Sequence, residues 1–246
     1  MALSSNALIH FTDSKERLFG ILENEFKVKY CRETFRLHEL EVVLHIPMVS
    51  FCDIPFSQIK THIQSYGRYG IGLSKEWAIR NRLNPVLYVQ GESLFAQGYE
   101  DLMKLLLKEE EAGAVDGTAR RMAMDIARYI KNYEGPLDRR DNHVSRYRYS
   151  DEREWRYVPA YSEQHEMMYE AHRFLEVGRE MANASVADLR LSFVPDDIKY
   201  LIISSDAEIG GLIAHLDAVK GEKYTKRQIE RLTTRILTSE QIDGDF

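Results

Sequence analysis

Residues 149–159 read Y-S-D-E-R-E-W-R-Y-V-P. Trp155 and Tyr157 are residue types that favour strands. Pro159 ends the run, because proline has no N–H to offer a sheet ladder. The stretch therefore predicts a short strand, and the other segments of the chain can be placed around it.

Three charged side chains of this strand are expected on one face. Side chains alternate between the two faces of a strand, so Glu152, Glu154 and Arg156 point the same way. Carboxylates at positions i and i+2 lie roughly 6.5 to 7 Å apart, and such proximity tends to raise the pKa of one of them. The pair suits acid–base chemistry or the stabilisation of a developing cation. The alternative is an exposed edge strand with cross-strand Glu–Arg pairs.

The composition is ordinary for a soluble globular protein. The chain has 246 residues, of which 44% are hydrophobic and 29% charged, enough for one large domain or two small ones. No apolar run approaches the roughly 20 residues of a membrane span, and residues 1–6 lack the pattern of a signal peptide. Cys31 and Cys52 have no metal-ligand spacing. We therefore expect a cytoplasmic protein with no membrane partner. The net charge of −6 argues against a nucleic-acid surface over the whole molecule.

The N-terminal segment predicts a strand followed by a helix. Residues 7–12, A-L-I-H-F-T, read as a short buried strand. Asp13 or Ser14 can cap the helix that follows. His10 has apolar neighbours, so it is either a satisfied core residue or a hydrogen-bond donor at a ligand pocket. Thr12 shares its face.

The next segment is less regular. Residues 26–40 have mixed charge and little periodicity, and we interpret them as loop with partial strand. Residues 41–51 are a strand candidate that Pro47 interrupts, which favours two short pieces or an edge strand. Pro55 then begins a short helix.

Residues 64–74, Q-S-Y-G-R-Y-G-I-G-L-S, combine glycines with two tyrosines. The glycines allow tight turns and close backbone approach to a ligand. The spacing is not G-x-G-x-x-G, and the stretch precedes a strand, so we reject a dinucleotide-binding Rossmann interpretation. Tyr66 and Tyr69 either pack the turn or stack on a flat aromatic ligand. A short helix over 75–81 and a strand over 85–90 follow.

Helical periodicity dominates residues 99–133, with a break at 113–117. We predict a helical insertion at about 97–137 within a single domain over residues 1–246.

The C-terminal part alternates helices and strands. The sequence predicts a helix over 161–182, a buried strand over 198–204 and an amphipathic helix over 206–219. Residues 226–237 are a helix or a helix plus a strand.

Arginines gather ahead of the central strand. They are Arg139, Arg140, Arg146 and Arg148, with tyrosines interleaved at 147 and 149. Such a pattern can bind a phosphate backbone or a pyrophosphate. A solvated charged face is the alternative.

The order of three features resembles the His…Tyr…Glu arrangement of ADP-ribosyltransferases. The strand with His10, the Tyr/Gly-rich stretch and the strand with Glu154 follow one another. The segments L-I-H-F-T-D-S and L-F-G-I-L-E-N resemble the opening of the DarT-type transferases. The Ser-Thr-Ser run of one transferase branch is absent and only Ser50 stands there, which assigns the His-Tyr-Glu branch.

Longer stretches resemble the AbiGi family of bacterial abortive phage resistance proteins, which has been labelled an antitoxin component. The similar stretches cover nearly the whole chain. They are A-L-I-H-F-T (7–12), I-P-M-V-S-F-C-D-I-P (46–55), Y-G-R-Y-G-I-G-L-S-K-E-W (66–77), N-P-V-L-Y-V (84–89), D-E-R-E-W-R-Y-V-P (151–159) and T-R-I-L-T-S-E-Q-I (234–242).

The transferase resemblance implies an α+β fold in which two small packed β-sheets surround a cleft, with outer helices and a helical insertion. It implies an NAD-dependent mono-ADP-ribosyltransferase that acts as the toxic effector of anti-phage defence, with NAD as substrate and no metal. The acceptor would be nucleic acid or protein, with the arginines favouring nucleic acid. Antitoxin or chaperone proteins would be its partners.

The same resemblance assigns roles to residues. Glu154 would stabilise the oxocarbenium-like ribose as nicotinamide leaves, and Glu152 would orient the acceptor. The NAD-binding residues would be His10, Thr12, Ser50 and Tyr66 or Tyr69. The acceptor would contact Arg139, Arg140, Arg146 and Arg148. The alternative is a non-enzymatic antitoxin or binding module of an abortive infection system that retains these residues structurally.

Overall fold

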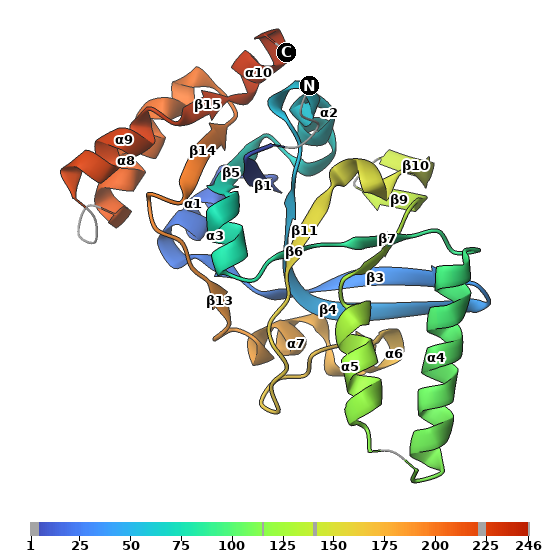
Figure 1. Cartoon of the computed structure of the whole chain (residues 1–246). Helices are drawn as coiled ribbons and strands as arrows, with labels where there is room; N and C mark the ends of the chain where they lie inside the picture. Colours follow the sequence, from blue (N-terminus) through green and yellow to red (C-terminus); the bar gives the residue numbers. More distant parts are fainter. Residues whose placement is uncertain (1–4, 115, 140–141, 221–224, 246) are drawn as a thin grey trace. The chain divides into compact units, whose positions relative to one another are not determined.

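The computed structural model describes residues 5–114, 116–139, 142–220 and 225–245. Figure 1 draws the whole chain. Contacts divide it into two compact units. Unit 1 comprises Met1–Lys27, Val49–Asn84 and Arg190–Phe246, and unit 2 comprises Val28–Met48 and Pro85–Leu189. The mixture of helices and strands confirms the α+β class. Two packed sheets around a cleft, and a single domain over residues 1–246, stay predictions.

Unit 1 contains a sheet built around the predicted N-terminal strand. β1 (Ala7–Thr12) pairs antiparallel with β5 (Tyr69–Ser74), which pairs with β14 (Ile198–Ile203). β15 (Ile236–Thr238) runs parallel to β14. The end of β4 (Leu40–Cys52) joins the other edge of β1. The strands predicted over 7–12 and 198–204 are confirmed.

Helices complete unit 1. Ser14 caps the first of them through its hydroxyl, which accepts the N–H of Arg17 and decides between the two predicted caps. One helix with β15 after it confirms the helix-plus-strand alternative near the C-terminus. The helices are α1 (Lys15–Asn24), α2 (Phe56–Tyr66), α3 (Lys75–Arg80), α8 (Ile209–Lys220), α9 (Lys226–Thr233) and α10 (Ser239–Asp245). The short elements are β2 (Phe26–Lys27), β13 (Arg190–Leu191) and the 3-10 turn η2 (Asp206–Glu208).

Unit 2 is organised on a long hairpin of β3 (Lys29–Leu37) and β4, visible in Figure 1. The register runs without a break from Lys29↔Met48 to Leu37↔Leu40. The interpretation of residues 26–40 as loop with partial strand is therefore wrong. Mixed charge conceals the strand because the hairpin buries some positions of β3 and leaves others exposed.

Pro47 does not interrupt β4, contrary to the sequence prediction. Its partner across the hairpin is Tyr30, whose N–H bonds to the side chain of Asn183 and so points away from β4. Tyr30 and Pro47 are thus a pair that exchanges no ladder bonds. The missing N–H of proline therefore costs the hairpin nothing at this position.

The remaining elements of unit 2 follow the chain. The helices predicted within 97–137 are confirmed, but the helical part ends at Ala127, and a strand and the start of another fill the rest. The helices are α4 (Leu94–Glu111), α5 (Thr118–Ala127), α6 (Ala171–Val177) and α7 (Arg179–Ser185). The strands are β7 (Leu87–Val89), β8 (Ile130–Asn132), β9 (Gly135–Arg139), β10 (Asn142–Tyr147), β11 (Glu154–Tyr157) and β12 (Tyr169–Glu170), with β6 (Asn84–Pro85) at the unit boundary and a 3-10 turn η1 (Tyr149–Glu152).

The single helix predicted over 161–182 is wrong. The chain forms β12 and then two short helices, α6 and α7, which Gly178 separates. Gly178 has φ +80°, a conformation that ends a helix and that glycine adopts without steric strain.

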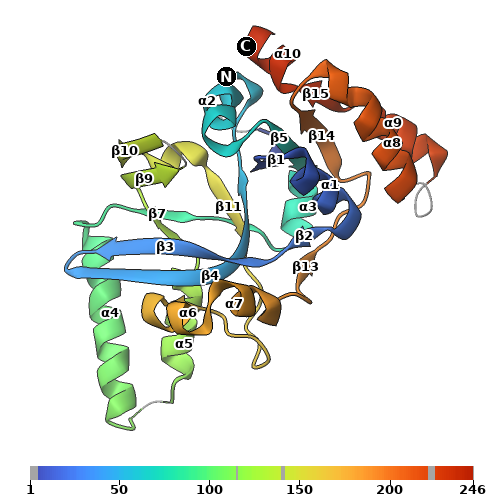
Figure 2. The same ribbon diagram turned by 180° about the vertical axis from the view of Figure 1, so that it is seen from behind.

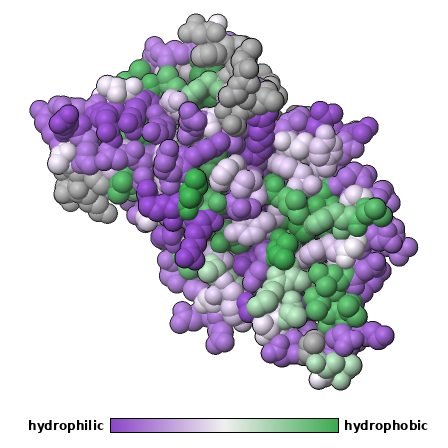
Figure 3. All heavy atoms as spheres, in the orientation of Figure 1, coloured by the Kyte–Doolittle hydropathy of each residue, from purple (hydrophilic) through white to green (hydrophobic). Residues whose placement is uncertain are grey.

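Two helical layers cover the faces of the hairpin. On one face, Phe35 and Ile46 pack with Ala96 of α4 and Ala127 of α5. On the other face, Tyr30 packs with residues of α6 and α7, the helices beside β4 in Figure 2. Figure 3 shows apolar surface over α4 and α5, which carry exposed apolar side chains. Those side chains include Leu102, Leu105, Met122 and Ile126. Among the described residues, no helix combines the length and apolarity needed to cross a bilayer.

Gly67 offers a test of the fold of unit 1. It has φ +120°, and a Cβ there would lie 2.3 Å from the carbonyl oxygen of Thr12. Gly67→Ala should therefore lower the free energy of unfolding by about 2 kcal/mol or more, measured by urea denaturation. The control is Gly20→Ala within α1, where a Cβ meets nothing within 4 Å. That variant should be as stable as the wild type or slightly more stable. Equal stability of both variants would contradict the close approach.

Candidate functional site

The central stretch folds as a turn followed by a strand. Tyr149 to Glu152 form η1, Arg153 has φ +45°, and only then does β11 begin at Glu154. The prediction that Glu152 lies on the strand is therefore wrong. Ser150 and Asp151 favour turns, and the left-handed residue at 153 redirects the chain into the strand.

Glu154 and Arg156 do share one face of β11, as predicted. Their exposed fractions are 4% and 0%, so the alternative of an exposed edge strand is wrong. The backbone of Glu154 is held on both sides. Its N–H donates to the hydroxyl of Tyr88, and its carbonyl accepts the N–H of Val86.

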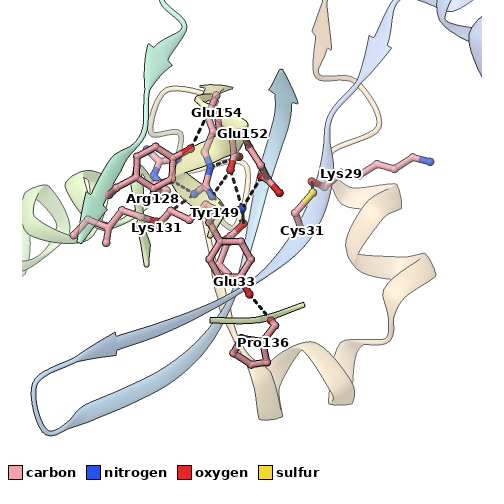
Figure 4. Close-up of polar contacts among 12 residues, drawn as sticks. Lys29, Cys31, Glu33, Arg128, Lys131, Pro136, Tyr149, Glu152 and Glu154 are labelled. Atoms are coloured by element: carbon pink, nitrogen blue, oxygen red, sulfur yellow. Dashed lines mark hydrogen bonds and ion pairs between the residues drawn. The ribbon is translucent and has the colours of Figure 1, made fainter. Parts of the chain in front are cut away.

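Arg156 binds two carboxylates at once, those of Glu33 and Glu154. Figure 4 labels both of these glutamates. Its Nε donates to Oε1 of Glu154 at 2.6 Å and its Nη2 to Oε2 at 3.3 Å, so the pair is bidentate. The same Nη2 lies 2.9 Å from Oε1 of Glu33. Nη1 donates to the carbonyls of Arg128 and Ile130. Every nitrogen of this buried guanidinium has an acceptor.

Lys131 is the second cation of the site. Its Nζ lies 2.8 Å from Oε2 of Glu154, 3.7 Å from Glu152 and 3.8 Å from Glu33. The ammonium also lies 5.1 Å from the ring centroid of Tyr149. We call Glu33, Lys131, Glu152, Glu154 and Arg156 the ion cluster.

The ion cluster has three carboxyl groups and two cations, so full ionisation would leave one excess negative charge. The pKa shifts of Glu152 and Glu154 bear on which carboxyl loses its charge. Burial opposes ionisation of Glu154, but Arg156 and Lys131 outweigh it and hold its pKa well below the ordinary value. Burial raises the pKa of Glu152 far above its ordinary value, and the charges of Glu154 and Glu33 raise it further. Glu152 is therefore the carboxyl of the cluster that protonates most readily, and its protonation would make the cluster neutral.

Two members of the ion cluster were missed by the sequence analysis. Glu33 belongs to residues 26–40, which we interpreted as loop with partial strand, although Y-C-R-E-T-F is rich in strand formers. Lys131 follows Ile130 on β8, a strand of three residues that the predicted helical insertion covered. Strand composition could have located Glu33, but Lys131 gives no sequence signal of its own.

A pocket of about 450 Å³ adjoins the ion cluster within unit 2. It is bordered by three consecutive residues of β3, by Lys131 and Asn132, and by the segment that begins β9. Tyr149 also lines it, and its hydroxyl donates to the carbonyl of Pro136.

The residues predicted to bind NAD lie in unit 1, whereas Glu152 and Glu154 lie in unit 2. Their convergence on one cleft stays a prediction. His10 packs against the rings of Phe26 and Phe51, and its Nδ1 donates to the carbonyl of Ser50 at 2.8 Å. Burial lowers the pKa of His10 more than this bond raises it, which favours the neutral imidazole.

The other residues predicted to bind NAD have contacts within unit 1. Thr12 is buried and pairs with Tyr69 across the sheet. The hydroxyl of Tyr69 donates to Glu208 at 3.0 Å. The ring of Tyr66 stacks on His62 at 5.7 Å. These contacts match the packing alternative, and a role in stacking on nicotinamide stays a prediction.

Three of the four arginines predicted to bind an acceptor lie in the described part of the chain. Arg139 ends β9, and Arg140 lies outside the described residues. Arg146 is exposed and pairs with Glu134 at 2.8 Å. Arg148 is exposed and lies over the ring of Tyr133. Acceptor binding by these residues stays a prediction.

One group of side chains has the composition of a metal site. The ligand atoms of His38, Glu39 and Glu100 lie within 4.8 Å of one another. However, one oxygen of Glu100 accepts the N–H groups of Glu39 and Leu40, and the other pairs with Lys104. Glu100 therefore stabilises the turn between β3 and β4, and this use of its oxygens does not fit a metal ligand.

The sequence of the chain matches a family model over residues 24–204, well over half of its length. The description of that family is abortive phage resistance protein AbiGi, antitoxin. The chain belongs to the AbiGi family. The matched span includes the whole ion cluster, so these five residues are part of the region that defines membership.

An AbiGi relative is known from Lactococcus lactis subsp. cremoris. It is named abortive phage resistance protein AbiGi, and it is 26% identical over 245 residues, covering 91% of this chain and 96% of its own length. No solved structure matches the chain. The comparisons thus support anti-phage defence, and they do not show the predicted transferase fold or activity.

The dependence of this AbiGi fold on Arg156 can be measured. Arg156→Met should lower the free energy of unfolding by about 3 to 5 kcal/mol, because the buried carboxylate of Glu154 and the partly buried carboxylate of Glu33 lose their shared cation. The control is Arg146→Met, which breaks an exposed pair and should cost at most about 1 kcal/mol. Urea denaturation measures both. Similar effects of the two changes would show that the ion cluster contributes no more than a surface pair.

The protonation of Glu152 predicts a pH effect. A raised native pKa stabilises the fold below the ordinary carboxyl pKa, and this contribution is lost as pH rises through the native pKa. Glu152→Gln should therefore be more stable than the wild type at pH 8, and the difference should shrink towards pH 5. Denaturation at several pH values measures it, with the exposed Glu163→Gln as control. A constant difference across this range would contradict the raised pKa.

Proposed function

We propose that the chain is the antitoxin-type component of an abortive phage resistance system, and that it acts by holding a partner protein. The description of the AbiGi family supports this role. The observation that carries the proposal is the state of Glu154, the carboxylate on which transferase chemistry would depend.

A carboxylate that stabilises an oxocarbenium-like ribose must face the anomeric carbon with its charge available. Both oxygens of Glu154 are instead bound by Arg156 and Lys131, and its side chain is 5% exposed. Two cations already balance this charge, so it would attract a third cation only weakly. Releasing it would leave Arg156 buried with one fewer partner, which carries a penalty of several kcal/mol.

An NAD-dependent ADP-ribosyltransferase is the second candidate. It is favoured by the opposite pKa shifts of Glu152 and Glu154, since pairs whose pKa values are pushed apart often divide acid and base roles. In this proposal Glu154 stabilises the ribosyl cation and Glu152 orients a nucleic-acid or protein acceptor. NAD would be held by His10, Thr12, Ser50 and Tyr66 or Tyr69, and the acceptor by Arg139, Arg140, Arg146 and Arg148.

Growth and NAD turnover separate the two candidates. The antitoxin proposal predicts that the wild-type chain, expressed alone in a bacterial host, does not slow growth. It also predicts no rise in melting temperature with millimolar NAD and no release of nicotinamide. Co-expression with the toxic component of the same defence system should restore growth that this component alone abolishes.

The transferase predicts the opposite pattern. Expression alone should be toxic, NAD should raise the melting temperature, and Glu154→Gln should abolish both toxicity and nicotinamide release. Glu163→Gln serves as the control for a neutralised surface carboxylate. Nicotinamide release by the wild type that Glu154→Gln removes, with folding confirmed by circular dichroism, would overturn the antitoxin proposal.

A further inference from the structure

The outer edge of β3 has a defined hydrogen-bonding pattern. Leu37 and Leu40 flank a two-residue turn, so they form a hydrogen-bonded pair. Hydrogen-bonded and non-hydrogen-bonded pairs alternate along an antiparallel hairpin. Arg32 and Thr34 belong to non-hydrogen-bonded pairs, so their N–H and C=O groups point away from β4. The hydrogen bond from the N–H of Tyr30 to Asn183 confirms this alternation, because Tyr30 also points away from β4.

Asparagine side chains occupy this outer edge at both ends. Oδ1 of Asn183 accepts the N–H of Tyr30 at 3.0 Å. Oδ1 of Asn132 accepts the N–H of Arg36 at 3.1 Å, and its Nδ2 donates to the carbonyl of Arg36 at 2.9 Å. Asn132 thus makes the two bonds that a neighbouring antiparallel strand would make.

Between these asparagines the edge is open. Within the residues that the structure describes, no strand pairs with the outer edge of β3, and the backbone groups of Arg32 and Thr34 have no partner. The pocket of about 450 Å³ is lined by Arg32, Glu33 and Thr34 together. Side chains of neighbouring residues point to opposite faces of a strand. A pocket lined by Arg32, Glu33 and Thr34 together therefore lies along the edge of β3.

We infer that this edge binds an extended peptide segment of the partner protein, which adds a strand to β3. The inference rests on the proposed function, which supplies a protein partner. An extended chain presents N–H and C=O groups on alternate residues and can match those of Arg32 and Thr34 about 7 Å apart. A helix has its backbone groups internally bonded and offers no such match.

The charges around the pocket indicate the sequence of this segment. Arg32 makes no ion pair with any residue that the structure describes, and it is exposed. The acidic residues that line the pocket each already pair with a cation. These pairs are Glu33 with Arg156, Glu41 with Arg36, and Glu134 with Arg146. The uncompensated charge favours a segment with an acidic side chain beside Arg32.

Amide hydrogen exchange of the wild-type chain tests the open edge. The amides of Arg32 and Thr34 should exchange at least about 100-fold faster than those of Glu33 and Phe35, which face β4 in the same strand. The probe for binding is a heptapeptide mixture, Thr-Val-X-Val-X-Val-Thr, in which X is Asp, Lys or Ser. The Asp members should slow the amides of Arg32 and Thr34 by tenfold or more.

Two controls separate ladder formation from other binding. Heptapeptides with N-methylated alternate amides keep their side chains and lose the ladder donors, so they should bind at least tenfold more weakly. Thr34→Pro removes an edge N–H where a proline is tolerated and should weaken binding at least tenfold, whereas Thr34→Val should change it less than twofold. Arg32→Ala should remove the preference for Asp.

Several outcomes would overturn the inference. They are equal exchange of all four amides in the free chain, no slowing by any heptapeptide, and equal binding of N-methylated heptapeptides. A concentration-dependent dimer that Thr34→Pro abolishes would assign the edge to a second copy of the chain. The growth assays do not use these peptides, so failure here and failure of the antitoxin role are distinguishable.

Discussion

The guanidinium of Arg156 is the interaction on which unit 2 depends. It is fully buried, and it joins β11 to Glu33 of β3 and to the backbone that leads into β8. A buried cation is tolerated only when its charge and all its donors are satisfied. The ion cluster meets this condition by lowering the pKa of Glu154 and raising the pKa of Glu152. The strands that bring these side chains together therefore also determine the charge balance of the cluster.

This constraint bears directly on function. Perturbed carboxylates beside a pocket often mark a catalytic site, but structural ion networks perturb pKa values in the same way. Here the bidentate bond to Arg156 and the contact with Lys131 use both oxygens of Glu154. The pocket is lined by Arg32, Glu33 and Thr34 of β3, and the exposed edge of a sheet can pair with an extended peptide.

Sequence patterns predicted the elements whose signals are local. The strand with His10, a helix cap at Asp13 or Ser14, and the helical periodicity after residue 99 all depend on neighbouring residues. The shared face of Glu154 and Arg156 followed from alternation alone. The β3 strand was missed because it carries both charged and apolar residues. Some of its positions in the hairpin are buried and others are exposed, so its composition is mixed. The tolerance of Pro47 depends on the register with Tyr30, which no local pattern contains. Glu33 and Lys131 join the cluster only through tertiary structure.

The hairpin also determines the order in which unit 2 can form on the ribosome. Its strands are joined by a two-residue turn at His38 and Glu39, so pairing has a small loop-closure cost. Arg156 is translated much later, roughly 6 to 25 s after Glu33 at typical elongation rates. During that interval Glu33 lacks Arg156, its cationic partner in the folded unit. The ion cluster can therefore lose its water only late in synthesis. Unit 2 cannot complete its folding before Arg156 leaves the exit tunnel of the ribosome.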